Sequence, residues 1–482
     1  MLRNALYTSA PPIVRLMGGF ILTPFILNSL GENVFTIWKV VASIIAMSWL
    51  LQLGMNSYIN RVIPYNLSKN NKDEIYEAVM TVRVFYRLVT IVIVFLGLWY
   101  IGFVDNSQEY KVAFSICLLG YVIFTPFSYL KGVMTGHQEY VLLGKIDFFS
   151  YALYFSLSLL LCFFWQNSYA FYFVSIIPIV VPVFFIYYFS HKRGYRYVIK
   201  RKLTLYPVKK AISYSSTAML FSFVGMLYVN VTLFYLYDNF SVSAVTGYIL
   251  IYQIVSIIPS ILVMMLSTIK PELSRLDGLN DFTSINKIRN QIGLLIVSIL
   301  SIYFFILNLH LNDILQIWIG SNVKLLSDKA LLVLFVGQLS WCLLNLNYFV
   351  LNSMAKHTKI SAVSSCALGI LFLVSYASLK NYESINEFTV WINTLLFLIM
   401  CYSFFDVNKT MKSSLTFNVN YKFSAFVCLV IVMIINSVTI YPYRFMISPI
   451  FLVVSLCIFY FILLTEEHQK IIKRKLCRKQ LQ

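Results

Sequence analysis

Four positively charged residues lie inside stretches that are otherwise long and apolar: Arg15, Lys39, Arg83 and Arg87. A charge near the centre of a bilayer costs on the order of 2.5–3.5 kcal/mol even on a lenient scale, so such residues tend to mark substrate or ion pathways. Arg83 and Arg87 are four residues apart and share one helix face. At 1.5 Å per residue, Arg87 is expected about 12 Å from the cytoplasmic side, near the midplane. These cations favour a water-filled cavity that accepts an anion.

A second interpretation of the same residues is structural. Long cationic side chains can keep their charged ends in the interface while their stems lie in the apolar layer. This alternative applies to Arg15, Lys39 and Arg83, and less readily to Arg87 because it lies deeper. A guanidinium nevertheless suits a phosphate, because its planar fork can bond two oxygens at once.

Other polar residues in apolar segments are weaker candidates. Asp147, in GKIDFFSYAL, could titrate with a coupling ion. Alternatively, it is a residue at the start of its helix that the helix dipole stabilises, or it pairs with a nearby lysine. In the second half, Asn230, Gln253 and Asn345 could contact sugar hydroxyls, and hydrogen bonds between helices are the alternative.

The elements that must position these residues are transmembrane helices. The mean hydropathy is +0.77 and only 12% of the residues are charged, which excludes a soluble globule. About fourteen apolar segments are long enough to span a bilayer, which predicts an all-α integral membrane protein; twelve helices would remain if two segments were interfacial. The segments lie near 11–30, 34–53, 79–104, 112–130, 147–166, 168–190, 211–237, 243–268, 290–311, 330–353, 360–379, 388–405, 423–440 and 447–464.

The distribution of charge predicts the orientation. Of the 38 Lys and Arg residues, 29 fall in loops on one side of these segments, five on the other side and four inside. Short loops rich in Lys and Arg stay in the cytoplasm, so both termini are predicted to be cytoplasmic. The cytoplasmic loops include residues 54–78 and 269–289. The net charge of +19 is therefore attributed to topology and anionic headgroups rather than to nucleic acid.

The basic segment 191–210, with eight Lys or Arg and no acid, divides the chain into two sets of six helices. The predicted plan is an N-terminal lobe (1–190), this linker, a C-terminal lobe (211–410), an extra hairpin (411–465) and a basic tail (466–482). Two parallel six-helix repeats would be related by an axis along the membrane normal. Weak internal similarity supports the plan: LGENVFTIWKVVASIIAMSWLLQLGMNSYINRVIP resembles FSVSAVTGYILIYQIVSIIPSILVMMLSTIKPELSRL.

No catalytic motif or metal-binding cluster occurs in a fitting context. The loops are too short for a catalytic domain, and the cysteines lack the CxxC spacing and the histidine neighbours of a metal site. The sequence therefore argues against an enzyme and predicts no cofactor and no metal.

Several short segments resemble a known family. RLMGGFILTPFILNSLGENVFTIWKVVASI, LLQLGMNSYINR, KGVMTGHQEYVLLGKIDFFSYAL and MLSTIKPELSRLDG occur in the order and spacing of the Wzx-type O-antigen flippases. These flippases belong to the multidrug/oligosaccharidyl-lipid/polysaccharide (MOP) exporter superfamily. One departure is that relatives often carry an acid where Gln52 stands, so a coupling role for that acid does not transfer.

The resemblance implies a function. The substrate would be an oligosaccharide on a polyprenyl diphosphate of the undecaprenyl type, moved from the cytoplasmic to the periplasmic leaflet of the bacterial inner membrane. Two lobes would alternate in access, driven by a proton or sodium gradient, and a polysaccharide polymerase is an implied partner. A multidrug exporter, a membrane-embedded polymerase or ligase, and a scaffold without transport activity are the alternatives.

Overall fold

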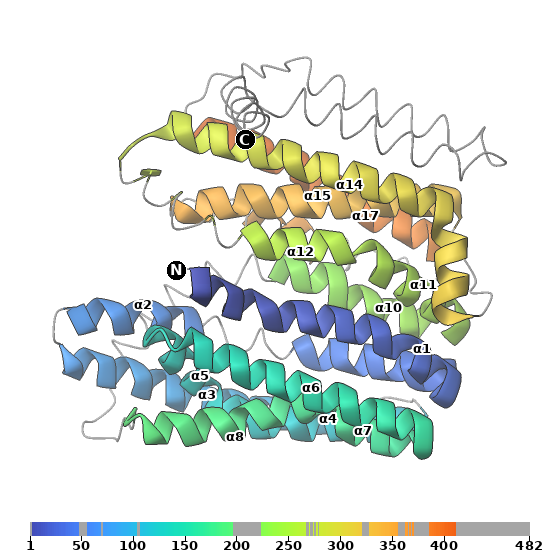
Figure 1. The fold of residues 1–482 in the computed structure, drawn as a ribbon, viewed down its shortest axis with the longest axis horizontal. Coiled ribbons are helices and arrows are strands. Elements are labelled where there is room, and N and C mark those ends of the chain that lie inside the picture. Colours follow the sequence, from blue (N-terminus) through green and yellow to red (C-terminus); the bar gives the residue numbers. More distant parts are fainter. Residues whose placement is uncertain are drawn as a thin grey trace, which may run out of the picture. The chain divides into compact units, whose positions relative to one another are not determined.

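The regular elements that the computed structural model describes are all helical (Figure 1). The described residues are 2–47, 55–68, 71–103, 107–195, 223–266, 279–320, 327–354 and 385–410, with scattered positions in 269–277 and 362–370. The predicted hairpin within 411–465 and the predicted spans 360–379, 423–440 and 447–464 lie wholly or mostly outside these residues.

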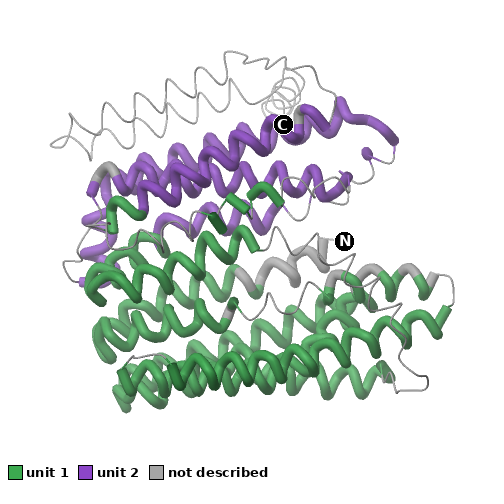
Figure 2. Tube along the Cα trace, turned by 180° about the vertical axis from the view of Figure 1, so that it is seen from behind, with its two compact units in different colours: residues 1–253, 324–326, 358–388 green, residues 254–323, 327–357, 389–482 purple. Residues whose placement is uncertain are grey.

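Contacts divide the chain into two compact units (Figure 2). Unit 1 comprises residues 1–253, 324–326 and 358–388, and unit 2 comprises residues 254–323, 327–357 and 389–482. This division follows packing and so differs from the predicted boundaries at 190 and 210. The repeat plan of two six-helix lobes stays a prediction.

Unit 1 holds the helices that bear the four intramembrane cations. Its elements are α1 (Leu2–Met47), α2 (Met55–Ser68), α3 (Lys72–Phe103), α4 (Gln108–Phe124), the 3-10 turn η2 (Thr125–Phe127), α5 (Ser128–Gly136), α6 (Tyr140–Phe164), α7 (Ser168–Ser175), α8 (Ile177–Lys192), the π-helical turn η3 (Leu227–Val231), α10 (Thr232–Asn239) and most of α11 (Val242–Val255). Helices α1 and α6 pack along each other, as do α6 and α8.

Unit 2 contains α12 (Ile257–Leu266), α14 (Phe282–Ile319), α15 (Asp328–Ser353) and most of α17 (Ile385–Thr410). Helix α15 packs against α12 and α14. Phe304 of α14 stacks on Phe335 of α15 at 4.6 Å between ring centroids. Asn347 donates a hydrogen bond to the Ser403 hydroxyl at 2.7 Å, which ties α15 to α17.

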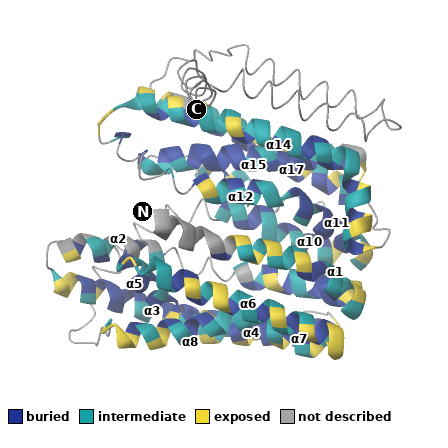
Figure 3. Ribbon diagram, in the orientation of Figure 1, coloured by how far each residue is buried: buried dark blue, intermediate teal, exposed yellow. Residues whose placement is uncertain are grey.

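Among the described residues, eight helices are long and apolar enough to cross a membrane, or nine with the bent pair α11–α12. The axes of α11 and α12 differ by 48°. The outer helices α6, α7 and α8 carry exposed residues along their free faces (Figure 3). Large apolar side chains are among them, including Phe163 and Phe184, which is expected of a surface that meets lipid.

Helix α1 is a hairpin whose two arms meet at Gly31. This residue has φ 86° and ψ 168°, a conformation that a residue with a Cβ rarely adopts. The bend separates the predicted spans 11–30 and 34–53. Gly18, on the first arm, allows a close approach to α6, because a Cβ there would lie 2.0 Å from the Phe155 ring.

The prediction that residues 54–78 form a loop is wrong for 55–68. This segment is the helix α2, and its Met55, Ile59 and Ile63 are fully buried in a core shared with α3 and α5. Apolar residues at spacing four form one helical stripe, although the segment as a whole is too polar to register as a span. The pattern Gly132-x-x-x-Gly136 on α5 gives α2 room, since a Cβ on Gly136 would lie 2.9 Å from Ile63.

Candidate functional site

The two arms of α1 bring Arg15 and Lys39 together. The positive charge of Arg15 acts on Lys39 and on Tyr121 of α4. Arg15 is exposed and Lys39 is half-buried. Two like charges are therefore held in one neighbourhood, which is favourable only where water or an anion screens them.

Aromatic rings surround Lys39. Its Nζ lies 4.5 Å from the centroid of the Trp38 ring and 5.5 Å from that of Phe35. Trp38 in turn packs edge-on against Phe171 of α7, at 5.4 Å between centroids. Such cation–π contacts stabilise an ammonium by about 0.5–2 kcal/mol and leave its charge intact. Lys39 is thus held by aromatic rings.

A second pair of cations lies on α3. The Arg83 guanidinium carbon is 5.8 Å from the centroid of the Tyr129 ring on α5, and both Arg83 and Arg87 act electrostatically on Tyr129. Tyr121 and Tyr129 belong to one continuous span, Gln108–Gly136, eight positions apart, which corresponds to about 12 Å along the helix. One tyrosine therefore faces each cation pair.

The four cations lie at different distances from the ends of their helices. Arg15 lies sixteen positions before the Gly31 bend, about 24 Å along its arm, and Lys39 lies eight positions after it, about 12 Å along the other arm. Arg87 and Arg83 lie about 24 Å and 30 Å along α3 from its end at Phe103. The four cations are thus spread along α1 and α3, and we refer to them as the cation ladder.

Among the described residues, none of these four cations forms an ion pair with a carboxylate; the ion pairs present involve other residues. Arg87 is exposed on the same face of α3 as Ile91 and Phe95, whose exposed fractions are 65% and 70%. Both interpretations of Arg87, a cavity and the interface, stay predictions.

Asp147 has a local partner. Its Oδ2 accepts from Lys131 Nζ at 3.0 Å, which joins α6 to α5. The sequence left several roles open for Asp147, and the structure shows the one in which it pairs with a nearby lysine. Whether Asp147 also titrates with a coupling ion stays a prediction.

The polar residues proposed for glycan contact have different surroundings. Gln253 of α11 exchanges a hydrogen bond with Thr23 of α1 at 3.3 Å. Asn345 donates to the Trp341 carbonyl of its own helix at 2.8 Å. Asn230 lies in the π-helical turn η3, a local geometry that is frequent at functional sites. A role in glycan binding stays a prediction for all three.

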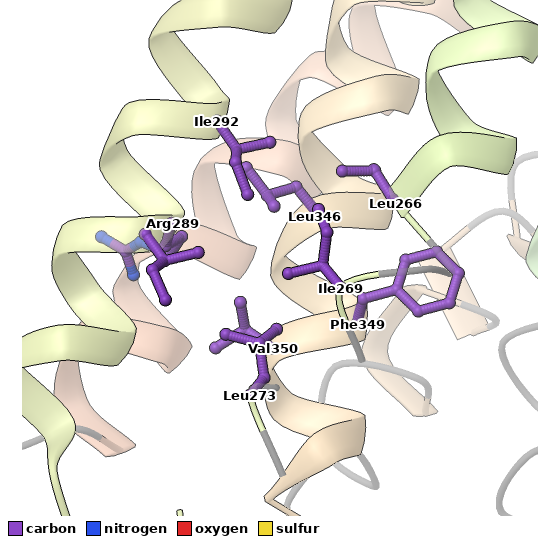
Figure 4. A pocket seen from close by; sticks show the side chains of 9 residues that line it. Leu266, Ile269, Leu273, Arg289, Ile292, Leu346, Phe349 and Val350 are labelled. Atoms are coloured by element: carbon purple, nitrogen blue, oxygen red, sulfur yellow. The ribbon is translucent and has the colours of Figure 1, made fainter. Parts of the chain in front are cut away.

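Sequence reasoning missed Arg289, which it placed in the loop 269–289. The structure places it in α14, with only 6% of the residue exposed. Its guanidinium carbon lies 5.7 Å from the centroid of the Phe404 ring of α17, and apolar side chains such as Ile292 and Leu346 surround it (Figure 4). The missed signal was Asp281, which caps α14 by accepting a hydrogen bond from the Ser284 backbone amide.

Neither a protein-family model nor a curated protein sequence matches the chain. Solved structures do. An inward-facing multidrug resistance MATE family transporter of the MOP superfamily matches with a TM-score of 0.60 and 12% identity, over 84% of this chain and 95% of that one. The Vibrio cholerae MATE transporter VcmN in the bent form gives 0.55 and 14%, over 85% and 97%.

The chain has the MATE transporter fold. An outward-facing MATE family structure of the same superfamily also matches, with a TM-score of 0.55, 14% identity and coverage of 86% of this chain and 96% of the other. The predicted all-α membrane fold with about 14, or 12, transmembrane helices is therefore confirmed, and the chain is a multi-pass membrane protein. At these identities the comparison establishes the fold, and the substrate has to be argued from the residues.

Proposed function

We propose that this protein is a flippase that moves an oligosaccharide linked to a polyprenyl diphosphate from the cytoplasmic to the periplasmic leaflet. The carrying observation is the ladder of four cations in unit 1, none of them ion-paired among the described residues. A diphosphate is a compact anion that a guanidinium binds through two parallel hydrogen bonds. Arg15, Arg83 and Arg87 would each offer such a fork.

The ladder suits a headgroup that has to cross the bilayer. Arg15 and Arg83 would meet the diphosphate near the cytoplasmic side, Arg87 would hold it near the midplane, and Lys39 would receive it closer to the far side. Electrostatic stabilisation at each depth offsets the cost of removing the anion from water. The lipid tail would stay in the bilayer beside the helices.

The proposal includes the finer assignments that accompany it. Alternating access would be driven by a proton or sodium ion, the polyprenyl carrier would be of the undecaprenyl type, and a polysaccharide polymerase would be a partner. The protein would lie in the bacterial inner membrane. Reporter fusions after residues 200 and 478 would both report the cytoplasm, and a fusion near Asn322 would report the periplasm. Disagreement between the two cytoplasmic fusions would mean that the even number of helices is wrong.

A second candidate is a multidrug exporter, supported by solved neighbours whose names describe multidrug resistance transporters. Cationic drugs would be repelled by the four cations of unit 1, which is why the flippase is preferred. Purified protein in proteoliposomes distinguishes the two. A lipid-linked oligosaccharide with a fluorophore on its sugar is added, and a membrane-impermeant quencher reports what fraction of it lies in the outer leaflet. Ethidium transport is measured in parallel.

The flippase predicts that the lipid-linked oligosaccharide equilibrates between leaflets only when the protein is present, and that ethidium stays in place. Transport of ethidium that is driven by an imposed ion gradient, without movement of the lipid-linked oligosaccharide, would overturn the proposal and favour the exporter.

A further inference from the structure

Helix α3 has one apolar side whose residues are largely exposed. Ile91, Phe95 and Leu98 have exposed fractions of 65%, 70% and 62%. They follow Arg87 by four, eight and eleven positions, the spacing at which residues share one side of a helix. Arg87 is itself exposed and lies at the end of this row that the loop charges predict to be nearer the cytoplasm. We call these four residues the Arg87 face of α3.

The opposite side of α3 packs against the rest of unit 1, and this packing fixes the direction of the Arg87 face. Tyr86 and Ile93 are only 0% and 4% exposed. Gly97 lies so close to α4 that a Cβ on it would be 2.5 Å from the Leu118 side chain. A rotation of α3 that buried the Arg87 face would break these contacts.

An exposed apolar face is usual in a membrane protein, and α6 and α8 have such faces too. Phe163 of α6 is 62% exposed and Phe184 of α8 is 70% exposed. The one Lys of α6 is Lys145, six residues into the helix, and α8 has no Lys or Arg before its last residue, Lys192. In contrast, Arg87 is the sixteenth of the 32 residues of α3. A cation in the middle of an exposed apolar face therefore distinguishes α3 from these two helices.

This combination suits an amphiphile with an anionic head and a long apolar tail. The Arg87 guanidinium can bond two phosphate oxygens at once. A tail joined to that phosphate is then held beside Ile91, Phe95 and Leu98, because the bound head raises the effective concentration of the tail there. Hydrophobicity alone would not select the tail, since the surrounding lipids are equally apolar. Beyond Arg87, α3 continues for about 24 Å without another charged residue, so a long tail can stay in contact.

We propose that the Arg87 face of α3 binds the polyprenyl tail of the lipid-linked oligosaccharide while Arg87 binds its diphosphate. The substrate therefore reaches unit 1 sideways from the bilayer, across the outer side of α3. The inference rests on the proposed flippase function and adds which helix the carrier lipid contacts.

The test is photochemical capture by a benzophenone amino acid that replaces Phe95 in the full-length protein. The protein is reconstituted in liposomes with radiolabelled undecaprenyl diphosphate that carries no sugar, and the matched control has the same amino acid in place of Phe184. Both phenylalanines are 70% exposed, so their contact with bulk lipid should be equal. Roughly threefold to tenfold more probe should be captured at position 95, because Arg87 tethers the tail there. Leu98 and Phe163, both 62% exposed, form a second pair for the case that a variant of the first pair is not retained in the membrane.

Two further measurements separate the contribution of the head from that of the tail. Arg87→Ala should reduce capture at position 95 to the level at position 184, because the diphosphate is no longer held. Radiolabelled undecaprenol, which has the same tail but no phosphate, should be captured equally at both positions.

Three results would overturn the inference. They are equal capture of the diphosphate probe at positions 95 and 184, an excess at position 95 that Arg87→Ala leaves unchanged, and an equally large excess for undecaprenol. Flipping of the fluorescent lipid-linked oligosaccharide is measured with the quencher in parallel liposomes. Normal flipping together with any of these results would reject the tail contact and keep the flippase. Capture that depends on Arg87, in a protein that flips no lipid-linked oligosaccharide, would keep the tail contact and reject the flippase.

Discussion

The two units hold their intramembrane arginines in opposite ways. In unit 1, Arg15 and Arg87 are exposed and Arg83 and Lys39 half-buried, each near aromatic rings that leave the charge available. In unit 2, Arg289 is 6% exposed and packed among apolar side chains and Phe404. The same residue type therefore has two different surroundings: the exposed guanidinium groups of unit 1 are available for the proposed anion binding, whereas the buried one of unit 2 contributes to packing.

The largest expected effect is on Arg87. Replacing it with Ala should lower flipping of the lipid-linked oligosaccharide about tenfold to a hundredfold, which corresponds to losing a charge-assisted hydrogen bond. Lys should restore part of the activity because it keeps the charge but loses the planar fork. Glu should be worse than Ala because it repels phosphate.

The control for Arg87 is Lys145→Ala, which removes an exposed cation of the same unit. Surface polysaccharide is measured in a complementation assay beside immunoblots for protein level. If Arg87→Ala is well expressed and exports normally, Arg87 only reaches the interface and the contrast between the units loses its functional meaning.

Arg289 should affect stability rather than transport. Arg289→Ala removes buried packing and is expected to cost about 1–3 kcal/mol, seen as a lower midpoint of thermal inactivation in detergent. Arg289→Met should keep most of the stability because its stem fills similar space. The control is Lys287→Ala, because Lys287 is an exposed cation two positions before Arg289 in the same helix. A loss of flipping by a stable Arg289→Met variant would place Arg289 in the transport machinery.

Two glycines sharpen the comparison of packing. A Cβ on Gly136 of unit 1 would lie 2.9 Å from Ile63 of α2, whereas on Gly293 of unit 2 the nearest atom, of Leu346, is 3.5 Å away. Gly136→Ala should therefore destabilise by about 1–2 kcal/mol. Gly293→Ala should be neutral or stabilise by about 0.5–1 kcal/mol through helix propensity. Thermal inactivation of both variants is the measurement, and equal midpoints would contradict the close α2–α5 packing.

The smallest expected effect is a pH dependence at the end of α5. Burial lowers the pKa of His137, opposed in part by Glu139, and His137 stacks on Tyr195 at 4.1 Å between ring centroids. A lowered pKa favours the neutral ring in the folded protein. The resulting stability is present above the unfolded pKa of about 6.5 and is lost as the pH falls below it. The midpoint temperature of thermal inactivation should fall between pH 7 and pH 5, and it should fall less steeply in His137→Phe. Identical slopes in the two proteins would contradict the assignment.

Much of the fold could be predicted from local sequence. The spans that contain α3, α6 and α14 are long apolar runs, and a bilayer requires each run to satisfy its own backbone hydrogen bonds, so composition alone indicates a helix. The positions of Arg15, Lys39, Arg83 and Arg87 within such runs could be found the same way. Hydropathy failed for α2, because its apolar stripe is only one face of a polar helix, and for Arg289, because polar residues at the start of α14 resembled a loop.

The sequence by itself determined that this is a helical membrane protein and which helices carry the intramembrane charges. It also determined that Arg83 and Arg87 share one helix face. Only the tertiary structure decided the partners. Lys131 rather than Lys145 pairs with Asp147, the two α1 arms bring Arg15 near Lys39, and Thr36 meets Thr246 across 210 positions of chain. The physical reason is that hydropathy and helical period are local properties, whereas a contact depends on how distant helices pack.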